Sequence, residues 1–271
     1  MIGVFDSGFG GLTILTELQK TLPEYDFLYL GDNARAPYGT RSFSTIYKYT
    51  LEAVKTLFDS GCPLVILACN TASAKALRTI QQQDLPLLNP ENRVLGIVRP
   101  TAESIGLYTK TKHIGILATP GTVSSESYLI EIAHFFPEVK VTQQACPMFV
   151  PLVENGELHS KGTEYFVQKE IETLFKKDNE IDTILLACTH YPLLAPVIQK
   201  YLPEHVQILT QGKIVSQKTV DYLKRHPEID SKLTKNGKTE YFTTDTVDFF
   251  EKGALLFGKK NILAKNLTFL T

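Results

Sequence analysis

Short runs of apolar residues alternate along the chain with longer segments in which apolar residues recur at helical spacing. An apolar run of about four to eight residues bounded by turn residues predicts a buried strand, whereas a longer periodic segment predicts a helix. Strands that alternate with helices favour βαβ units, a mostly parallel sheet, and functional loops at the carboxyl ends of the strands. The predicted strands are residues 2–5, 27–30, 65–68, 94–98, 114–118, 139–142, 184–187, 206–209 and 241–244, the last followed by a helix through 249–257.

Parts of this pattern occur twice. Residues 65–71 have the sequence Val-Ile-Leu-Ala-Cys-Asn-Thr, and residues 184–190 have Ile-Leu-Leu-Ala-Cys-Thr-His. In a second matching pair, residues 3–8 and 115–120, a strand runs into a turn rich in Gly, Ser, Thr or Pro. Because the spacing from turn to cysteine is similar in both copies, the repeat predicts an α/β fold of two pseudo-symmetric domains, with mostly parallel sheets and the active site in the cleft between them. The predicted lobes are residues 1–97 plus 212–271, and residues 98–211.

Length and composition narrow the classes of partner. A chain of 271 residues is long enough for two α/β domains, each with its own core. Its formal charge of -1 disfavours nucleic acid as a partner and favours a small molecule. The opening residues lack the pattern of a signal peptide, and no apolar stretch approaches the roughly 18 residues that span a bilayer. We therefore expect a cytoplasmic protein with no membrane partner.

The four cysteines are Cys62, Cys69, Cys146 and Cys188. They predict no disulfide framework, and no pair has the spacing of a zinc site, so no metal is expected. Cys62 precedes a buried strand and is interpreted as a core residue. Cys69 and Cys188 each follow a predicted strand and precede a predicted helix, whose dipole favours the thiolate. Either alone would also fit a core position, but as a matched pair with polar followers they favour catalysis, since a modest fall from a pKa of ~8.5 makes a thiol a base at neutral pH.

A glycine-rich turn follows the first predicted strand. Gly8 and Gly10 match the start of a dinucleotide-binding fingerprint, with Asp32 about twenty residues further on. The match is incomplete, because Thr13 takes the third glycine position and Asp6 would direct a negative charge towards a pyrophosphate. The exposed backbone amides of such a turn also suit a carboxylate.

Further polar residues follow other predicted strands. Residues 31–39 form a loop in which Pro37 fixes the backbone and Gly39 allows close approach of a ligand. An ordinary surface turn would fit this segment too, but its place at a strand end favours binding. His190, beside the second cysteine, could be a general acid or base, and Glu154 could face the cleft, although a surface position is the default. Short groups that could hold an amino acid, or simply cap helices, are Asn70, Thr71, Thr119, Thr122 and Thr189.

Together these motifs resemble the glutamate racemases, a branch of the aspartate/glutamate racemase family of cofactor-independent amino-acid racemases. The resemblance covers essentially the whole chain, and the combination of motifs is specific although no single motif is. The Pro-Tyr-Gly loop and the Cys-Thr-His-Tyr-Pro segment favour the glutamate branch. The segments that carry it are Asp6-Ser7-Gly8, Gly31-Asp32 through Pro37-Tyr38-Gly39, Ala68-Cys69-Asn70-Thr71-Ala72, Cys146-Pro147 through Glu154, and Cys188-Thr189-His190-Tyr191-Pro192.

The resemblance implies that two lobes close on glutamate and interconvert its L- and D-isomers without a cofactor, which supplies D-glutamate for peptidoglycan. Cys69 would exchange the α-proton of D-glutamate and Cys188 that of L-glutamate, one as thiolate while the other is protonated. Asp6 would assist Cys69, and His190 would assist Cys188. A homodimer is expected. The substrate-binding candidates are Asp6, Ser7, Tyr38, Gly39, Asn70, Thr71, Thr119, Thr122, Glu154, Thr189 and His190.

The sequence departs from the usual family pattern at both predicted crossovers between the lobes. Val98-Arg99-Pro100-Thr101 stands where Glu-Pro-Gly is more usual, and Thr210-Gln211-Gly212 stands where Asp-Ser-Gly is more usual. These departures concern oligomer geometry or regulation more than chemistry. Two other classes of protein stay open: a two-lobed amino-acid-binding protein with structural cysteines, and a dinucleotide-dependent enzyme.

Overall fold

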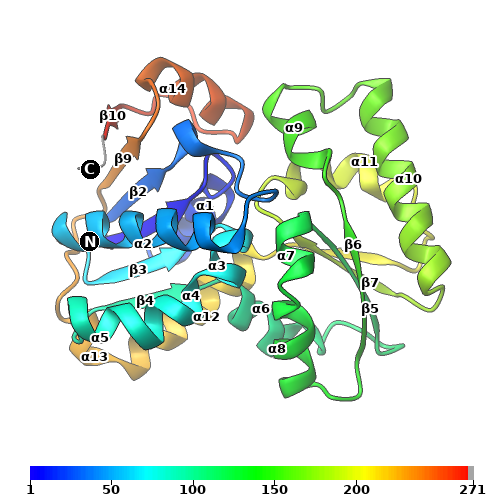
Figure 1. The fold of residues 1–271 in the computed structure, drawn as a ribbon, viewed down its shortest axis with the longest axis horizontal. Helices are drawn as coiled ribbons and strands as arrows, with labels where there is room; N and C mark the ends of the chain where they lie inside the picture. The colour runs from blue at the N-terminus through cyan, green and yellow to red at the C-terminus, as the bar shows by residue number, and fades with distance from the viewer. Residues whose placement is uncertain (268–271) are drawn as a thin grey trace.

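A computed structural model, which describes residues 1–267, contains two parallel sheets side by side (Figure 1). The six-stranded sheet has the order β10-β9-β2-β1-β3-β4, and the four-stranded sheet has the order β6-β5-β7-β8. Every pairing within them is parallel. The strands are β1 (Ile2–Asp6), β2 (Phe27–Gly31), β3 (Leu64–Leu67), β4 (Arg93–Gly96), β5 (His113–Ala118), β6 (Lys140–Ala145), β7 (Thr183–Ala187), β8 (Gln207–Leu209), β9 (Thr239–Thr243) and β10 (Ala264–Asn266).

Helices cover both faces of the six-stranded sheet, with α2 in front of it and α1 and α12 behind in Figure 1. The fold is therefore the α/β class that the sequence predicts. The helices are α1 (Leu12–Thr21), η1 (Asn33–Arg35), α2 (Phe43–Asp59), α3 (Asn70–Lys75), α4 (Leu77–Thr79), η2 (Ile80–Asp84), α5 (Leu85–Leu88), α6 (Val98–Ile105), α7 (Pro120–Ser124), α8 (Ser127–Phe135), α9 (Phe149–Glu154), α10 (Lys161–Lys177), η3 (Tyr191–Leu194), α11 (Ala195–Gln199), α12 (Gly212–Arg225), α13 (Pro227–Asp230) and α14 (Val247–Leu256).

The two sheets repeat one strand order. Strands β2-β1-β3-β4 of the larger sheet correspond one by one to β6-β5-β7-β8 of the smaller sheet. The two pairs of similar segments in the sequence fall on β1 with β5 and on β3 with β7. Strands β9 and β10 return to the larger sheet and extend it beyond β2. The division into lobes at residues 97/98 and 211/212 stays a prediction, although the chain passes between the sheets near both points.

Alternating side chains of the strands pack into separate cores on the two faces of the larger sheet. On β1, Ile2 and Val4 join the apolar residues of α1, whereas Phe5 joins those of α2. Cys62 is fully buried in the α2 core, as predicted, and a side-chain carbon added at Gly3 would lie 3.2 Å from its Cβ. A third core fills the space between α6, α8 and the smaller sheet. Each lobe thus has a rigid sheet that can position groups at its strand ends.

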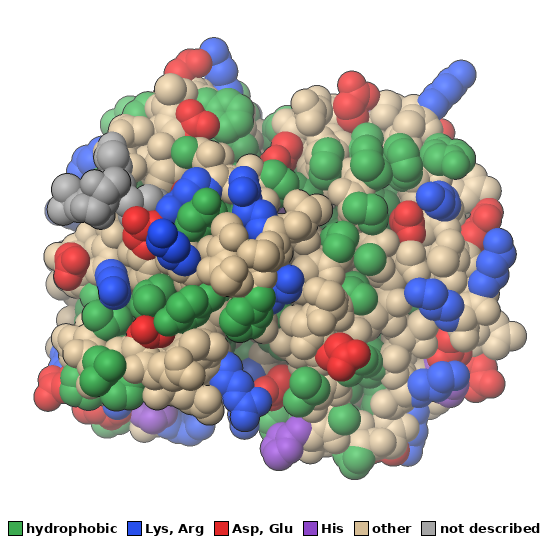
Figure 2. Space-filling view, in the orientation of Figure 1, with side chains coloured by type: hydrophobic (Ala, Val, Ile, Leu, Met, Phe, Trp, Pro, Cys, Tyr) green, Lys and Arg blue, Asp and Glu red, His purple; other side chains and the backbone are tan. Residues whose placement is uncertain are grey.

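The carboxyl ends of both sheets face the junction between them. Strand β1 ends at Asp6 and β3 leads into Cys69, while β5 leads into Thr119 and β7 into Cys188. A notch is visible in the surface where the two halves meet, and acidic and basic side chains are intermixed over this face (Figure 2). Among the residues described, no helix is long and apolar enough to cross a membrane.

Strand β7, one of the two central strands of the smaller sheet, offers a test of core packing. Leu186 of β7 is 1% exposed and belongs to the apolar core. Leu186→Ala should lower the free energy of unfolding by about 2–5 kcal/mol, because it removes buried contacts and leaves a cavity. Urea denaturation measures this, with Leu263→Ala as the matched control, since Leu263 is 85% exposed and its loss should change the free energy by less than about 0.5 kcal/mol. Equal losses in the two variants would contradict the assigned core.

Candidate active site

Both predicted catalytic thiols are buried, but their local structures differ. Cys69 is the N-cap of α3: its sulfur accepts a hydrogen bond from the Ala72 backbone N–H, and its thiol donates one to the Ser7 hydroxyl, both at 3.5 Å. The predicted helix directly after Cys188 is absent: Thr189 and His190 form a turn, and only a short 3-10 helix begins at Tyr191. Pro192 lies in the first turn of that helix and cannot donate a backbone hydrogen bond. The helix-dipole argument therefore applies to Cys69 alone.

Asp6 lies fully buried at the junction of the lobes. Its Oδ1 accepts from the Gly8 backbone N–H at 3.1 Å, and its Oδ2 accepts from the Thr189 hydroxyl, across the junction, at 3.4 Å. Burial raises the pKa of the Asp6 carboxyl, although the charge of His190 opposes this. Burial, reinforced by Asp6, also raises the pKa of the Cys69 thiol to about 12. The expectation that the helix end lowers this pKa is therefore wrong, because desolvation outweighs the dipole.

His190 connects the second thiol to a carboxylate. Its Nδ1 lies 3.9 Å from the Cys188 sulfur, and its Nε2 lies 2.9 Å from Oε1 of Glu154. Burial lowers the pKa of the imidazole, but the contacts with Cys188 and Glu154 outweigh burial and raise it to about 10. The ring of Phe257 packs edge-on against it at 5.4 Å. Glu154 thus faces the cleft instead of taking the default surface position.

Three threonines join the lobes beside Cys69. The hydroxyl of Thr71 lies 3.0 Å from that of Thr119 and 3.4 Å from that of Thr122. The Gly39 carbonyl accepts a hydrogen bond from the Gly121 backbone N–H at 2.7 Å. A side-chain carbon at Gly39 would lie only 2.8 Å from Cβ of Thr119, so a side chain there would require the lobes to separate. The loop of residues 31–39 therefore closes directly onto the second lobe.

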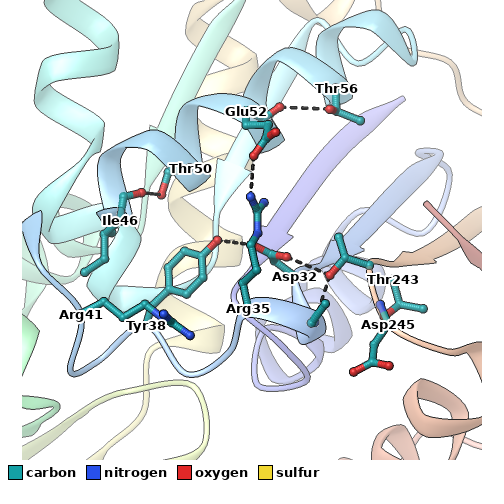
Figure 3. Close-up of polar contacts among 12 residues, drawn as sticks. Asp32, Arg35, Tyr38, Arg41, Ile46, Thr50, Glu52, Thr56, Thr243 and Asp245 are labelled. Carbon is teal, nitrogen blue, oxygen red and sulfur yellow. Dashed lines mark hydrogen bonds and ion pairs between the residues drawn. The ribbon is translucent and has the colours of Figure 1, made fainter. Parts of the chain in front are cut away.

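Asp32 holds that loop in place. Its buried carboxylate accepts hydrogen bonds from the Tyr38 hydroxyl, from Nε of Arg35 at 2.7 Å and from the Thr244 hydroxyl at 2.8 Å. Arg35 also bonds Glu52 of α2 at 2.5 Å, and Figure 3 shows the Tyr38 ring and Arg35 converging on Asp32. The Tyr38 side chain is thus engaged by Asp32. The carboxylate that would bind a ribose in the dinucleotide hypothesis is occupied by these three donors.

Asn70 has a different environment from the one expected of a substrate ligand. Its Oδ1 accepts from the Tyr128 hydroxyl at 2.6 Å, and its Nδ2 donates to Oε1 of Gln211 at 2.7 Å. The sequence reasoning missed Tyr128 because it lies within an ordinary helix, whereas Gln211 stands out only as a departure from the family pattern. It also missed Asn33, whose buried Nδ2 has no hydrogen-bond partner among the residues described and lies near Gly8.

Two cavities lie near the junction of the lobes. One of about 170 Å³ is lined in part by Cys188, Thr189 and Gln211. Another of about 720 Å³ lies against β4, α6, α8 and α12, and neither thiol lines it. The larger cavity is therefore separate from the site that contains the thiols. Among residues 1–267, no group of three or more His, Cys, Asp or Glu side chains is arranged to hold a metal ion.

The α/β fold places one buried thiol from each lobe at the junction, and such a pair of thiols can act as the acid and the base of an enzyme that transfers a proton. The chain belongs to the Asp/Glu/Hydantoin racemase family, whose model matches residues 12–218.

Individual relatives are similar over nearly the full length. The glutamate racemase of Ruegeria sp. (strain TM1040) is 39% identical over 271 residues, with 96% of this chain and 97% of that protein covered. The glutamate racemase of Persephonella marina is 40% identical, with 93% and 90% covered.

Solved structures of glutamate racemases are also similar over nearly the full length of the chain. That of glutamate racemase isoform RacE1 from Bacillus anthracis has a TM-score of 0.88 at 33% identity, with 99% of this chain and 97% of that chain covered. That of the Francisella tularensis glutamate racemase in complex with D-glutamate has a TM-score of 0.85 at 30% identity, with 100% and 97% covered.

The titration of His190 tests the electrostatics of the site. We expect its imidazole to titrate near pH 10 instead of near the ordinary 6.5, because Cys188 and Glu154 hold the proton. Since the folded-state pKa is the raised one, protonated His190 stabilises the fold fully below about pH 6.5 and ceases to do so as the pH rises through about 10. NMR of 15N-histidine-labelled protein measures the midpoint directly.

Glu154→Gln should lower that midpoint, because it removes one of the two raising contacts. Glu164→Gln is the control, since Glu164 pairs with Lys200 on the exposed surface and not with His190. A midpoint near 6.5 in the unmodified protein would contradict the assignment of a charged imidazole at neutral pH.

Proposed function

We propose that this protein interconverts L-glutamate and D-glutamate by transferring the α-proton between Cys69 and Cys188. The observation that carries this proposal is the pair of buried thiols at equivalent strand ends of two sheets, each beside an ionisable partner of different charge. The near full-length similarity to glutamate racemases supports glutamate as the substrate. The reaction would supply D-glutamate for peptidoglycan.

The substrate would lie between the lobes, whose proposed extents are residues 1–97 plus 212–271 and residues 98–211. Backbone amides and hydroxyls at the strand ends suit carboxylates and an ammonium group without adding net charge. Thr189 would both contact the substrate and donate its hydrogen bond to Asp6. The proposed binding residues are Ser7, Tyr38 and Gly39, which approach through the first turn and the loop, with Thr71, Thr119, Thr122, Thr189 and Glu154. Asn70 would contribute through its backbone, because Tyr128 and Gln211 bond its side-chain amide.

The proton balance requires the two sulfurs to be in opposite states. In the L-to-D direction, the Cys188 thiolate takes the α-proton from one face, and the Cys69 thiol donates its proton to the opposite face. The products are D-glutamate, a Cys188 thiol and a Cys69 thiolate, which is the state that D-glutamate needs for the reverse reaction. The pKa of about 12 for Cys69 supports the thiol form as its resting state.

Asp6 and His190 would assist different steps. The imidazolium of His190, held by Glu154, lies close enough to offset negative charge on the Cys188 sulfur. Asp6, whose pKa burial raises, can exchange a proton with the Cys69 side of the site. Exclusion of water and preorganised hydrogen-bond donors would lower the free energy of the carbanion-like transition state.

Replacement of either thiol tests the two-base mechanism. Cys69→Ser and Cys188→Ser should each lower kcat/KM by about 10²-fold to 10⁴-fold, because an alcohol is a far weaker acid than a thiol. Enantiomers have equal free energies, so kcat/KM must fall equally in both directions. Circular dichroism of each glutamate isomer over time measures both rates, and Cys62→Ala is the matched control because that thiol lies in the core between α2 and the larger sheet.

Activity that survives either serine substitution would contradict the two-thiol mechanism. Deuterium incorporation at the α-carbon in deuterated water, with no cofactor added, separates the racemase from an amino-acid-binding protein. Glutamate that binds to the unmodified protein in calorimetry, but never exchanges its α-proton, would favour the binding protein. We further propose that the protein is a homodimer, which sedimentation equilibrium would test.

A further inference from the structure

Gln211 is a buried residue at the point where the chain returns from the smaller sheet to the larger one. It follows β8, is 3% exposed and is the residue directly before α12. Its Oε1 accepts from Nδ2 of Asn70 at 2.7 Å. Its Nε2 donates to the Tyr128 hydroxyl at 2.7 Å and to the Thr101 hydroxyl at 3.0 Å. One side-chain amide therefore bonds three side chains from three different helices.

These bonds connect both crossings between the sheets. The first crossing runs from β4 through Ile97 into α6, and the second runs from β8 into α12. Thr101 donates to the Ile97 carbonyl at 2.7 Å, and Gln211 makes a longer contact with the same carbonyl at 3.4 Å. Any rotation of one lobe against the other must pass through these two crossings. Gln211 links the two crossings by hydrogen bonds at the point about which the lobes would rotate.

The same network reaches the first thiol. Asn70 directly follows Cys69 and is the first residue of α3. Gln211 and Tyr128 hold the two ends of its amide, and Tyr128 also bonds Gln211, so the three side chains form a closed ring of hydrogen bonds. A buried network in which each member is satisfied has one preferred arrangement. The start of α3, and with it the Cys69 sulfur, is thereby fixed relative to the hinge.

The network joins the two segments in which the sequence departs from the pattern of the family it resembles. Thr101 ends the first departing segment and Gln211 lies at the centre of the second, and their side chains contact each other directly. Glycine and serine at these positions could not form this bond: glycine has no side chain, and serine is too short to reach three helices. The two segments are far apart in sequence but form one structural unit.

We propose that Gln211 is a positioning residue, which locks the two crossings and, through Asn70, holds Cys69 at the distance that proton transfer requires. The role in catalysis rests on the proposed racemase function, whereas the role in ordering α3 does not. Misplacement of a reacting group by about 1 Å can slow a reaction by about 10²-fold. Gln211 itself is not among the proposed substrate-binding residues, so kcat should respond more than KM.

Gln211→Met keeps the length of the side chain and removes all of its hydrogen bonds. We expect kcat to fall between about tenfold and a hundredfold in both directions, with KM changed less than about threefold. Hydrogen-deuterium exchange of the amides of residues 70–75 should become faster. The matched control is Thr219→Val, which removes a buried hydroxyl from the same helix, α12, that bonds only the Val215 carbonyl. It should leave kcat and the exchange of α3 unchanged.

Tyr128→Phe provides a second variant in case Gln211→Met does not fold. It removes only one hydroxyl and should retain the fold. It should lower kcat in the same way, and the double variant should be no slower than the slower single variant, because both act through one network. A Gln211→Met protein with normal kcat and normal exchange at 70–75 would overturn the proposal. The proposal would also be overturned if Gln211→Met and Thr219→Val both lost thermal stability while each kept the kcat of the unmodified protein.

Parallel measurement of the unmodified protein separates the two proposals. If it does not racemise glutamate, the proposed function fails, and the exchange of residues 70–75 still decides whether Gln211 orders α3. If it racemises glutamate and Gln211→Met does so at the same rate, only the positioning role fails.

Discussion

The buried carboxyl group of Asp6 is the interaction around which the other charges of the site are arranged. It lies where the two sheets meet, and it gains hydrogen bonds from its own turn through Gly8 and from the opposite lobe through Thr189. A buried carboxyl is costly without such partners and a nearby cation. Burial and then the proximity of Asp6 raise the pKa of the Cys69 thiol, and the His190 cation opposes the rise in the pKa of Asp6. The contacts of Asp6 therefore affect both the closure of the lobes and the protonation states of the site.

The duplicated topology provides equivalent positions, and the residues that follow each strand make those positions chemically unequal. After β3, Cys69 caps a helix that begins at Asn70, and the Ala72 backbone N–H of that helix donates to the sulfur. After β7, the chain instead forms a turn that places an imidazole beside the sulfur. The first thiol is surrounded by neutral donors and an acid, and the second by a cation held by a carboxylate. A reaction that needs one base and one acid at any moment benefits from this difference.

The fold and the identity of the thiols could be predicted from sequence because both depend on local patterns. Apolar runs mark β1 to β9, and β10 was missed since two of its three residues, Lys265 and Asn266, are polar. The turn after Cys188 could not be predicted, because it depends on how Pro192 and the second lobe pack. The orientation of Glu154 and the raised pKa of Cys69 were missed for a related reason: burial and contacts between segments far apart in sequence decide them. Likewise, Asn70 looked like a substrate ligand, and only the fold shows that Gln211 and Tyr128 bond its amide.

The hydrogen bond between the Gly39 carbonyl and the Gly121 backbone N–H joins the loop of residues 31–39 to the second lobe, with no side chain on either residue. Separation of the loop from the second lobe at this point breaks a single backbone hydrogen bond of modest net strength. Water can satisfy both groups as soon as they separate. The contact between the loop and the second lobe can therefore break and re-form at little cost in free energy, while the sheets that carry the thiols keep their shape.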